Sequence, residues 1–444
     1  MITTLRFSFR LLFFLLAFWF LDGTLLATPS IQRTILPNQI VLLVSEEHSL
    51  PFVTFQLLID AGSQKDPSGQ EGLARLTAKG LLLGTAQRTA KAINEELDFM
   101  GASLDSSAGR DYMNLSLRVL KKDQEKGLAL FLEVLTQPVF PPAEMKKGVE
   151  KTLAAIQAEE DQPEEVAEKA FQENLYLQGP YKFPVEGTKA SLPRITREDV
   201  VRFYQKYYHP DRSILAVVGD ITQEEIKTHL FPSLEKWPRG KIPEEPLKTE
   251  FTKGPKTVKI DRSLTQANII LGQNGVSRDN PDFYALQVMN YILGGGGFSS
   301  RLMEEVRNKR GLAYSVASFF DPGKYAGSFQ IVLQTKNNSA REAITLARDQ
   351  VERIRKEMVS EKELEGAQKY LVGSFPMRLD TQGKLANFLL QVEYYGLGLD
   401  YPARYPKLIQ SVSREEVLRV AQKYLHPDNY IMVIVADLKA AGLE

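Results

Sequence analysis

The sequence predicts a chain built from two similar α/β domains, because one stretch of it occurs twice. Residues 197–220 read REDVVRFYQKYYHPDRSILAVVGD and residues 414–437 read REEVLRVAQKYLHPDNYIMVIVAD, with 13 of 24 positions identical at an offset of 217. Each copy has the apolar spacing of a helix, then a His-Pro-Asp sequence where proline ends the helix, and then a β-branched run suited to a buried strand. A repeat of this length indicates a duplicated unit.

The boundary between the domains is expected where apolar periodicity stops. Residues 239–258 are rich in Pro, Gly, Lys and Glu and have no periodicity, as is usual for linkers. We therefore expect a first domain at residues 30–238 and a second at residues 259–444. A chain of 444 residues has room for two to four domains of roughly 100–200 residues each.

Strands and helices follow a similar order in both domains. In the first domain we expect strands at residues 39–44, 53–59 and 113–119, and helices at residues 71–83, 90–100 and 142–172, the last interrupted near Pro163. In the second we expect strands at residues 267–271 and 327–334, and helices at residues 281–293 and 361–375. The last of these is the expected counterpart of residues 142–172.

Composition excludes several classes of protein. Hydrophobic residues make up 43% and charged residues 25%, which are ordinary globular values. Lys+Arg and Asp+Glu both number 55, so no basic excess attracts nucleic acid. The chain has no Cys, which excludes disulfides, thiolate zinc sites and a Cys nucleophile.

The N-terminus has the pattern of a secretory signal. Arg6 and Arg10 precede an apolar run at residues 11–21, and a Leu-Leu-Ala end follows at residues 25–27. The apolar run is about half as long as a helix that spans a membrane. We therefore expect a signal peptide at residues 1–27, cleavage near Ala27, export to the periplasm and no membrane attachment afterwards. An uncleaved membrane anchor is the alternative.

Residues 72–85, GLARLTAKGLLLGT, resemble the active-site helix of the pitrilysin/insulinase metallopeptidases, whose pattern is G-L-A-H-x-x-E-H-x-x-x-x-G-T. The resemblance implies that Arg75 and Lys79 stand at the positions of two zinc-binding His, Ala78 at that of the general base, and Ala155 at that of the third ligand. Zinc binds neutral imidazoles or anionic oxygens, and cations at these positions repel it. We therefore expect no metal and no cofactor in this chain; a solvated helix face is the simpler reading of Arg75 and Lys79.

Two stretches of the second domain resemble the same family. They read LGGGGFSSRL at residues 293–302 and VRNKRGLAYS at residues 306–315. The resemblance implies that Arg307 and Tyr314 bind substrate backbone and stabilise an oxyanion in trans, at the zinc of another subunit. It also implies that Gly294, Gly295, Gly296 and Gly297 approach a bound peptide or act as a hinge. The alternatives are a surface Arg, a Tyr in a core strand and a flexible turn.

The resemblance implies two mainly antiparallel α+β domains that form half of a clamshell. It also implies the zinc-less subunit of a heterodimeric metalloendopeptidase, similar to the non-catalytic subunit of mitochondrial processing peptidase and of bacterial heterodimeric peptidases. We expect a homologous H-x-x-E-H partner that holds zinc, a peptide substrate, and no activity from this chain alone. A non-proteolytic structural or peptide-binding member of the family is the alternative.

An independent hydrolase has little support in the sequence. The chain has no G-x-S-x-G motif, no Cys, and only four His residues. His209 and His426 occupy equivalent places in the repeat, where we expect helix-end capping or packing. His48 and His229 are isolated, and we expect both to be solvated.

Overall fold

The computed structural model describes residues 30–240 and 248–444, in which residues Ile31–Glu444 form one compact unit. The signal peptide expected at residues 1–27 lies outside the described residues. Of the helices that the structure describes, none is both long enough and apolar enough to cross a lipid bilayer.

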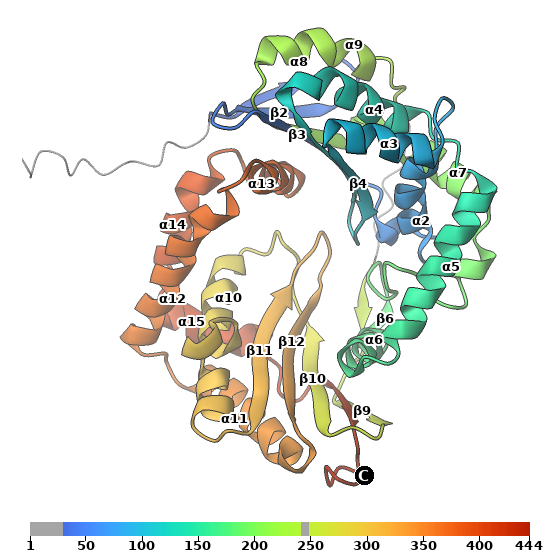
Figure 1. The fold of residues 1–444 in the computed structure, drawn as a ribbon. Coiled ribbons are helices and arrows are strands. Elements are labelled where there is room, and N and C mark those ends of the chain that lie inside the picture. Colours follow the sequence, from blue (N-terminus) through green and yellow to red (C-terminus); the bar gives the residue numbers. More distant parts are fainter. Residues whose placement is uncertain (1–29, 241–247) are drawn as a thin grey trace, which may run out of the picture. The chain divides into compact units, whose positions relative to one another are not determined.

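Each half of the chain forms a mainly antiparallel sheet, and five strands follow the same order in both (Figure 1). The first sheet has the order β1 (Gln32–Ile35), β2 (Val41–Glu46), β7 (Ser213–Gly219), β3 (Phe52–Ile59), β5 (Met113–Leu120), β4 (Ser103–Ala108). The second has the order β9 (Lys256–Asp261), β13 (Ile431–Ala436), β10 (Gln266–Asn274), β12 (Ser328–Lys336), β11 (Ala313–Asp321). In each sheet the repeated strand, β7 or β13, pairs in parallel with one neighbour and antiparallel with the other. The predicted duplication of a mainly antiparallel α/β unit is therefore confirmed.

Helices cover both sheets. Those of the first half are α2 (Leu73–Gly80), α3 (Ala90–Met100), α4 (Gln124–Thr136), α5 (Pro142–Glu159), α6 (Pro163–Leu175), α7 (Arg197–Tyr207), α8 (Gln223–His229) and α9 (Phe231–Leu234). Those of the second are α10 (Phe283–Asn290), α11 (Ala340–Lys356), α12 (Glu361–Ser374), α13 (Gln382–Tyr394), α14 (Tyr401–Gln410) and α15 (Arg414–Tyr424). The predicted break near Pro163 separates α5 from α6, because proline has no N–H to continue a helix and fits its first turn.

Two short strands and a change of helix type differ from the expected elements. The interval 239–258, expected to be a linker, contains β8 (Glu250–Phe251), which pairs with β6 (Tyr176–Gln178), and the start of β9. The expected helix at residues 281–293 ends as an α-helix at Asn290 and continues as a π-helix, Tyr291–Gly295. Ordered structure of the second half therefore begins before residue 259.

The repeated helix begins with the same local chemistry in both copies. In α7 the side chain of Thr196 accepts from the backbone of Asp199, whose carboxylate bonds back to Thr196. Ser413 and Glu416 form the same capping box in α15. At the end of α7, Nε2 of His209 lies 2.7 Å from a carbonyl oxygen of the last turn, so this His caps the helix as expected.

One helix of each half packs on the sheet of the other half. The apolar face of α6, including Phe171 and Leu175, packs with Val433 of the second sheet. The apolar face of α13, including Leu389, packs with Leu58 of the first sheet. Figure 1 shows α13 beside β2 and β3, and α6 beside the second sheet. Each sheet is therefore completed by a helix from the opposite half of the chain.

A buried polar cluster joins the two halves near these exchanged helices. The carboxylate of Asp111 accepts hydrogen bonds from the phenols of Tyr181 and Tyr395 and, at 2.8 Å, from the backbone N–H of Lys324. The ammonium of Lys324 lies 3.4 Å from the carboxylate of Asp60. Both carboxylates are only 7% exposed, so the hydrogen bonds replace the water that burial removes.

Candidate functional site

The first candidate region is the start of α2. Gly72 precedes the helix with φ of 98°, a left-handed conformation that favours glycine, and a Cβ there would lie 2.8 Å from the carbonyl oxygen of Glu186. The Asp66 carboxylate accepts from the N–H groups of Gly72 and Ala74 at 2.8 and 2.7 Å. Burial nevertheless raises the pKa of Asp66 to about 7, because it outweighs these hydrogen bonds. The Gly72 frame therefore has a packing role that does not depend on zinc.

The residues at the zinc-ligand positions form ion pairs. Arg75 Nη1 lies 2.8 Å from Glu186 Oε1, and Lys79 Nζ lies 3.3 Å from Asp105 Oδ1. Ala78, at the position of the general base, is fully buried. Arg75 and Lys79 thus present cations, each paired with an acid, where zinc would need electron-pair donors.

The third ligand position does not supply a carboxylate either. Ala155 is exposed on α5, and the nearest acid that follows it on this helix is Glu159. Burial raises the pKa of Glu159, with smaller contributions from the negative charges of Glu186 and Glu165, while Arg75 opposes the rise. Glu159 therefore lies in the electrostatic environment of the Arg75 ion pair.

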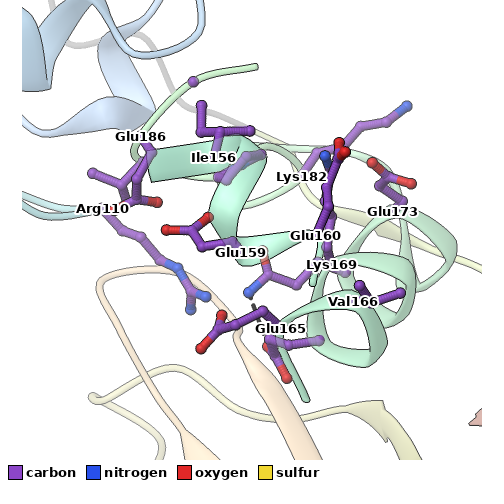
Figure 2. Close-up of a pocket in the computed structure, with 15 residues that line it drawn as sticks. Arg110, Ile156, Glu159, Glu160, Glu165, Val166, Lys169, Glu173, Lys182 and Glu186 are labelled. Atoms are coloured by element: carbon purple, nitrogen blue, oxygen red, sulfur yellow. Dashed lines mark hydrogen bonds between the residues drawn. The ribbon is translucent and has the colours of Figure 1, made fainter. Parts of the chain in front are cut away.

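Figure 2 shows Glu159 and Glu186 on the wall of a cavity of about 260 Å³, with Glu165, Arg110 and Lys182 among the other lining residues. Acidic side chains predominate on this wall, and Arg110, Lys169 and Lys182 are its bases. Among the described residues, no group of three or more His, Cys, Asp or Glu side chains is placed to hold a metal ion. The residues around α2 and α5 therefore do not fit a zinc ion.

The second candidate region begins with the glycine run at residues 294–297. A Cβ on Gly294 would lie 2.5 Å from the backbone nitrogen of Ser318, and one on Gly296 would lie 2.7 Å from the carbonyl oxygen of Tyr291. Gly297 has φ of 55°, a left-handed conformation. The run is a packed turn between a π-helix and the 3₁₀ helix Gly297–Ser299, and most of its glycines are required by close contacts.

The structure brings Arg307 and Tyr314 together and adds a ring that the sequence reasoning missed. The guanidinium carbon of Arg307 lies 5.9 Å from the ring centre of Tyr314 and 5.2 Å from that of Phe298. Both rings are 70% exposed. In the part of the chain that the structure describes, no carboxylate lies within 4.0 Å of this guanidinium. Phe298 directly follows the glycine run in the sequence. An aromatic residue next to such a turn is the sequence signal that could have identified it.

A bulge in β11 directs Tyr314 outward. The pairing of β11 with β12 shifts register between Ala313 and Ser315, which leaves Tyr314 as the extra residue. Bulges of this kind redirect a side chain and are frequent next to functional sites. The alternative that Tyr314 is a core-strand residue is therefore wrong.

Comparison with known proteins gives a consistent family. The model described as "Insulinase (Peptidase family M16)" matches residues 41–189, and the model described as "Peptidase M16 inactive domain" matches residues 194–371. A Helicobacter pylori protein described as a non-peptidase homolog, YmxG, is 27% identical over 90% of this chain and 93% of its own length. The beta subunit of the mitochondrial-processing peptidase of Blastocladiella emersonii is 23% identical over 94% and 91%.

Solved structures show the same architecture. A Pseudomonas fluorescens structure described as a peptidase M16 inactive domain superposes with a TM-score of 0.85 at 29% identity, over 92% of this chain and 98% of that one. A Helicobacter pylori protease superposes with a TM-score of 0.83 at 18% identity, over 92% and 99%, which shows the fold alone. The two family models together span more than half of the chain. With its duplicated sheets and the framing residues of α2, the chain belongs to the M16, or insulinase, peptidase family, as a member that lacks the zinc-binding residues.

Proposed function

We propose that this chain is the non-catalytic subunit of a heterodimeric zinc metalloendopeptidase and that it contributes Arg307 and Tyr314 in trans to a homologous H-x-x-E-H subunit. The observation that carries the proposal is that Arg307 lies beside Tyr314 and Phe298, whose rings are both exposed, and that no acid of residues 30–240 or 248–444 pairs with its guanidinium. An arginine whose role is structural usually has an acid or carbonyl partner, so this one is available to a ligand.

The chemistry of the pair suits a peptide undergoing hydrolysis. A guanidinium and a phenol both donate hydrogen bonds, and donors aimed at a carbonyl oxygen stabilise the negative charge that develops on it. The rings on either side of Arg307 limit the positions that its side chain can adopt. The chain's own groups therefore orient the peptide and donate to its carbonyl.

The catalytic metal and base are assigned to the partner, because the two ligand positions here carry paired cations and the base position is the buried Ala78. Similarity to a protein described as a subunit of a processing peptidase supports an assembly with a second chain. The acid-lined cavity beside the Arg75 ion pair has no role in the proposed chemistry.

The test is reconstitution with the H-x-x-E-H homologue from the same host. Arg307→Ala and Tyr314→Phe should each lower peptide turnover on the order of 10²–10³-fold, the cost of losing one oxyanion donor. Arg310→Ala is the matched control, since Arg310 is exposed, three residues away, and paired with Glu342 at 3.5 Å. Complex formation and zinc content should be the same in all variants.

Normal turnover by both variants, in complexes of normal composition, would disprove the role in trans. That result would favour the non-proteolytic alternative, a peptide-binding or structural member of the family, for which the described non-peptidase relative is a precedent. The chain without its partner should cleave no peptide in either case.

We further propose export to the periplasm with cleavage near Ala27. Support comes from the charged, apolar and small-residue order at residues 6–27, outside the described residues. N-terminal sequencing of exported protein should begin close to Thr28. Intact Met1 in a soluble cytoplasmic pool would contradict the proposal.

A further inference from the structure

A pocket of about 290 Å³ lies in the second half of the chain, between α10, the π-helix Tyr291–Gly295, α12 and the far end of β11. Five aromatic side chains line it: Phe283, Tyr291, Phe319, Phe320 and Tyr370. Its lining residues all belong to the described part of the chain and include no charged side chain. An uncharged, apolar occupant therefore fits it, because a charged group would lose hydration without gaining a partner.

The wall of the pocket is held in place by its own contacts. The rings of Tyr291 and Tyr370 lie 4.9 Å apart at 34°, and Asn290 is bonded to Ser318 through both ends of its amide, at 3.1 and 2.8 Å. Tyr370 is nevertheless 57% exposed and Phe319 is 38% exposed. The pocket is therefore preformed. Part of its aromatic surface is exposed to water, and a bound side chain would bury that surface.

The size of the pocket matches one large side chain. A protein cavity of about 150 Å³ lined by apolar residues holds benzene. At about 290 Å³ this pocket has room for the ring system of Phe, Tyr or Trp, or for Leu or Met. It is far smaller than the groove that a helix or a second folded chain would need.

The pocket neighbours the Arg307 site along the chain, since Tyr291 and Gly295 in its wall precede Phe298 and both regions include residues of β11. The hydroxyl of Tyr291, whose ring is part of the wall, accepts a 3.4 Å hydrogen bond from Ser299 Oγ. Ser299 directly follows Phe298 in the sequence. On β11, Tyr314 and Phe319 are five residues apart, about 17 Å at roughly 3.4 Å per residue. An extended peptide covers a similar length in about five residues. A peptide held at Arg307 can therefore place one of its side chains in the pocket.

We propose that this pocket is a specificity site for a large apolar side chain, Trp, Tyr, Phe, Leu or Met, of the peptide bound at Arg307 and Tyr314, at a position about five residues from the bond held there. The inference rests on the proposed function for the identity of the ligand. Binding to the pocket requires only this chain, so it can be measured without a partner and without catalysis.

The experiment uses the mature full-length chain and fluorescein-labelled extended peptides of Gly and Ser that carry a single Trp at a scanned position, or Ser at the same position. Anisotropy titration should show about tenfold tighter binding of the Trp peptide, as expected for burying one aromatic side chain. Phe319→Ala and Tyr370→Ala should remove that preference and leave the affinity for the Ser peptide unchanged, which also reports on folding. Phe99→Ala is the matched control, because Phe99 is 84% exposed on α3.

A second measurement does not depend on any variant. A peptide with benzophenone in place of Trp should cross-link to residues of α10, α12 or β11. Three results would each overturn the inference. They are equal affinity for the Trp and Ser peptides, a preference for Trp that survives in the Phe319→Ala, Tyr370→Ala double variant, and cross-links to other elements. If the reconstituted complex cleaves peptides without any apolar preference, the specificity site is wrong and the proposed function stands. If the chain prefers the Trp peptide but its Arg307→Ala variant is fully active in the complex, the pocket stands and the proposed function is wrong.

Discussion

Two regions resemble functional segments of the family, the helix α2 and the segment around Arg307. Their charged side chains differ in whether they are paired. On α2, Arg75 and Lys79 are each paired with an acid from another element. Beside β11, Arg307 contacts two exposed rings and, at 4.0 Å, the sulfur of Met303, and among the described residues no acid pairs with it. Paired charges satisfy one another within the chain, whereas an unpaired cation between exposed rings gains by contact with another molecule. The contrast favours the proposed binding role for the second region, whereas the charges of the first region are satisfied within the chain.

A paired arginine close to Arg307 gives the largest expected effect on stability. Arg301 is only 8% exposed and makes two hydrogen bonds, 2.6 and 3.0 Å, to the Glu363 carboxylate. Glu363→Gln should lower the free energy of unfolding by about 2–3 kcal/mol, since it weakens hydrogen bonds to a buried charge. Chemical denaturation measures this loss. A change below about 0.5 kcal/mol would show that Arg301 is as independent of acid partners as Arg307.

The same pair predicts a pH dependence. Burial alone would raise the pKa of Glu363, but the hydrogen bonds from Arg301 and from the backbone of Ser360 outweigh it and lower the pKa to about 2. The pKa in the folded state lies below the ordinary glutamate value of 4.5, so the contribution is present above about pH 4.5 and is lost as pH falls toward 2. The difference in stability between wild type and Glu363→Gln should therefore shrink over that range.

A substitution that keeps the charge separates the two regions by their activity. Arg307→Lys retains a cation but loses the planar fork of hydrogen-bond donors beside the two rings, so turnover of the reconstituted complex should fall about tenfold, or about 1.4 kcal/mol. Arg75→Lys, made in the same way, should leave turnover unchanged, because Arg75 pairs with an acid of its own chain. Equal losses in both variants would abolish the distinction between the regions.

The smallest expected effect is on the ion pair of α2. The side chains of Arg75 and Glu186 are 37% and 36% exposed, so water and salt screen their attraction. Glu186→Gln should cost less than about 1 kcal/mol of unfolding free energy, and less again at high salt. A loss of several kcal/mol, measured by denaturation at two salt concentrations, would mean that this pair holds the fold together.

Much of the fold could be predicted from local chemistry. The helix at residues 90–100 has the predicted bounds, and Pro163 separates two helices as expected. The partners of Arg75 and Lys79 could not be predicted, because Glu186 and Asp105 are brought to α2 by tertiary packing. The packing of α6 and α13 on the sheet of the opposite half was also missed. An apolar stripe predicts that one face of a helix is buried, but it does not predict which sheet packs against that face.

In the candidate site, the family resemblance singles out Arg307 and Tyr314, and their role stays a prediction. What could not be read was the geometry that places them together. A bulge leaves Tyr314 outside the regular alternation of β11, and a π-helix carries Arg307. Neither irregularity has a period that a sequence pattern reveals. The position of Phe298 depends on the turn of the glycine run in the same way.

The exchanged helices also constrain how the protein can be made. The first sheet has all its strands once β7 ends at Gly219 but still lacks α13, which ends at Tyr394. Helix α6 ends at Leu175, before any strand of the second sheet is synthesised. A chain that emerges from its N-terminus therefore carries uncovered apolar surface on the first sheet and on α6 until these later elements appear, the condition in which chaperones bind and aggregation begins. Separately produced halves would each lack a cover, and they would have to interlock with one another to fold at all.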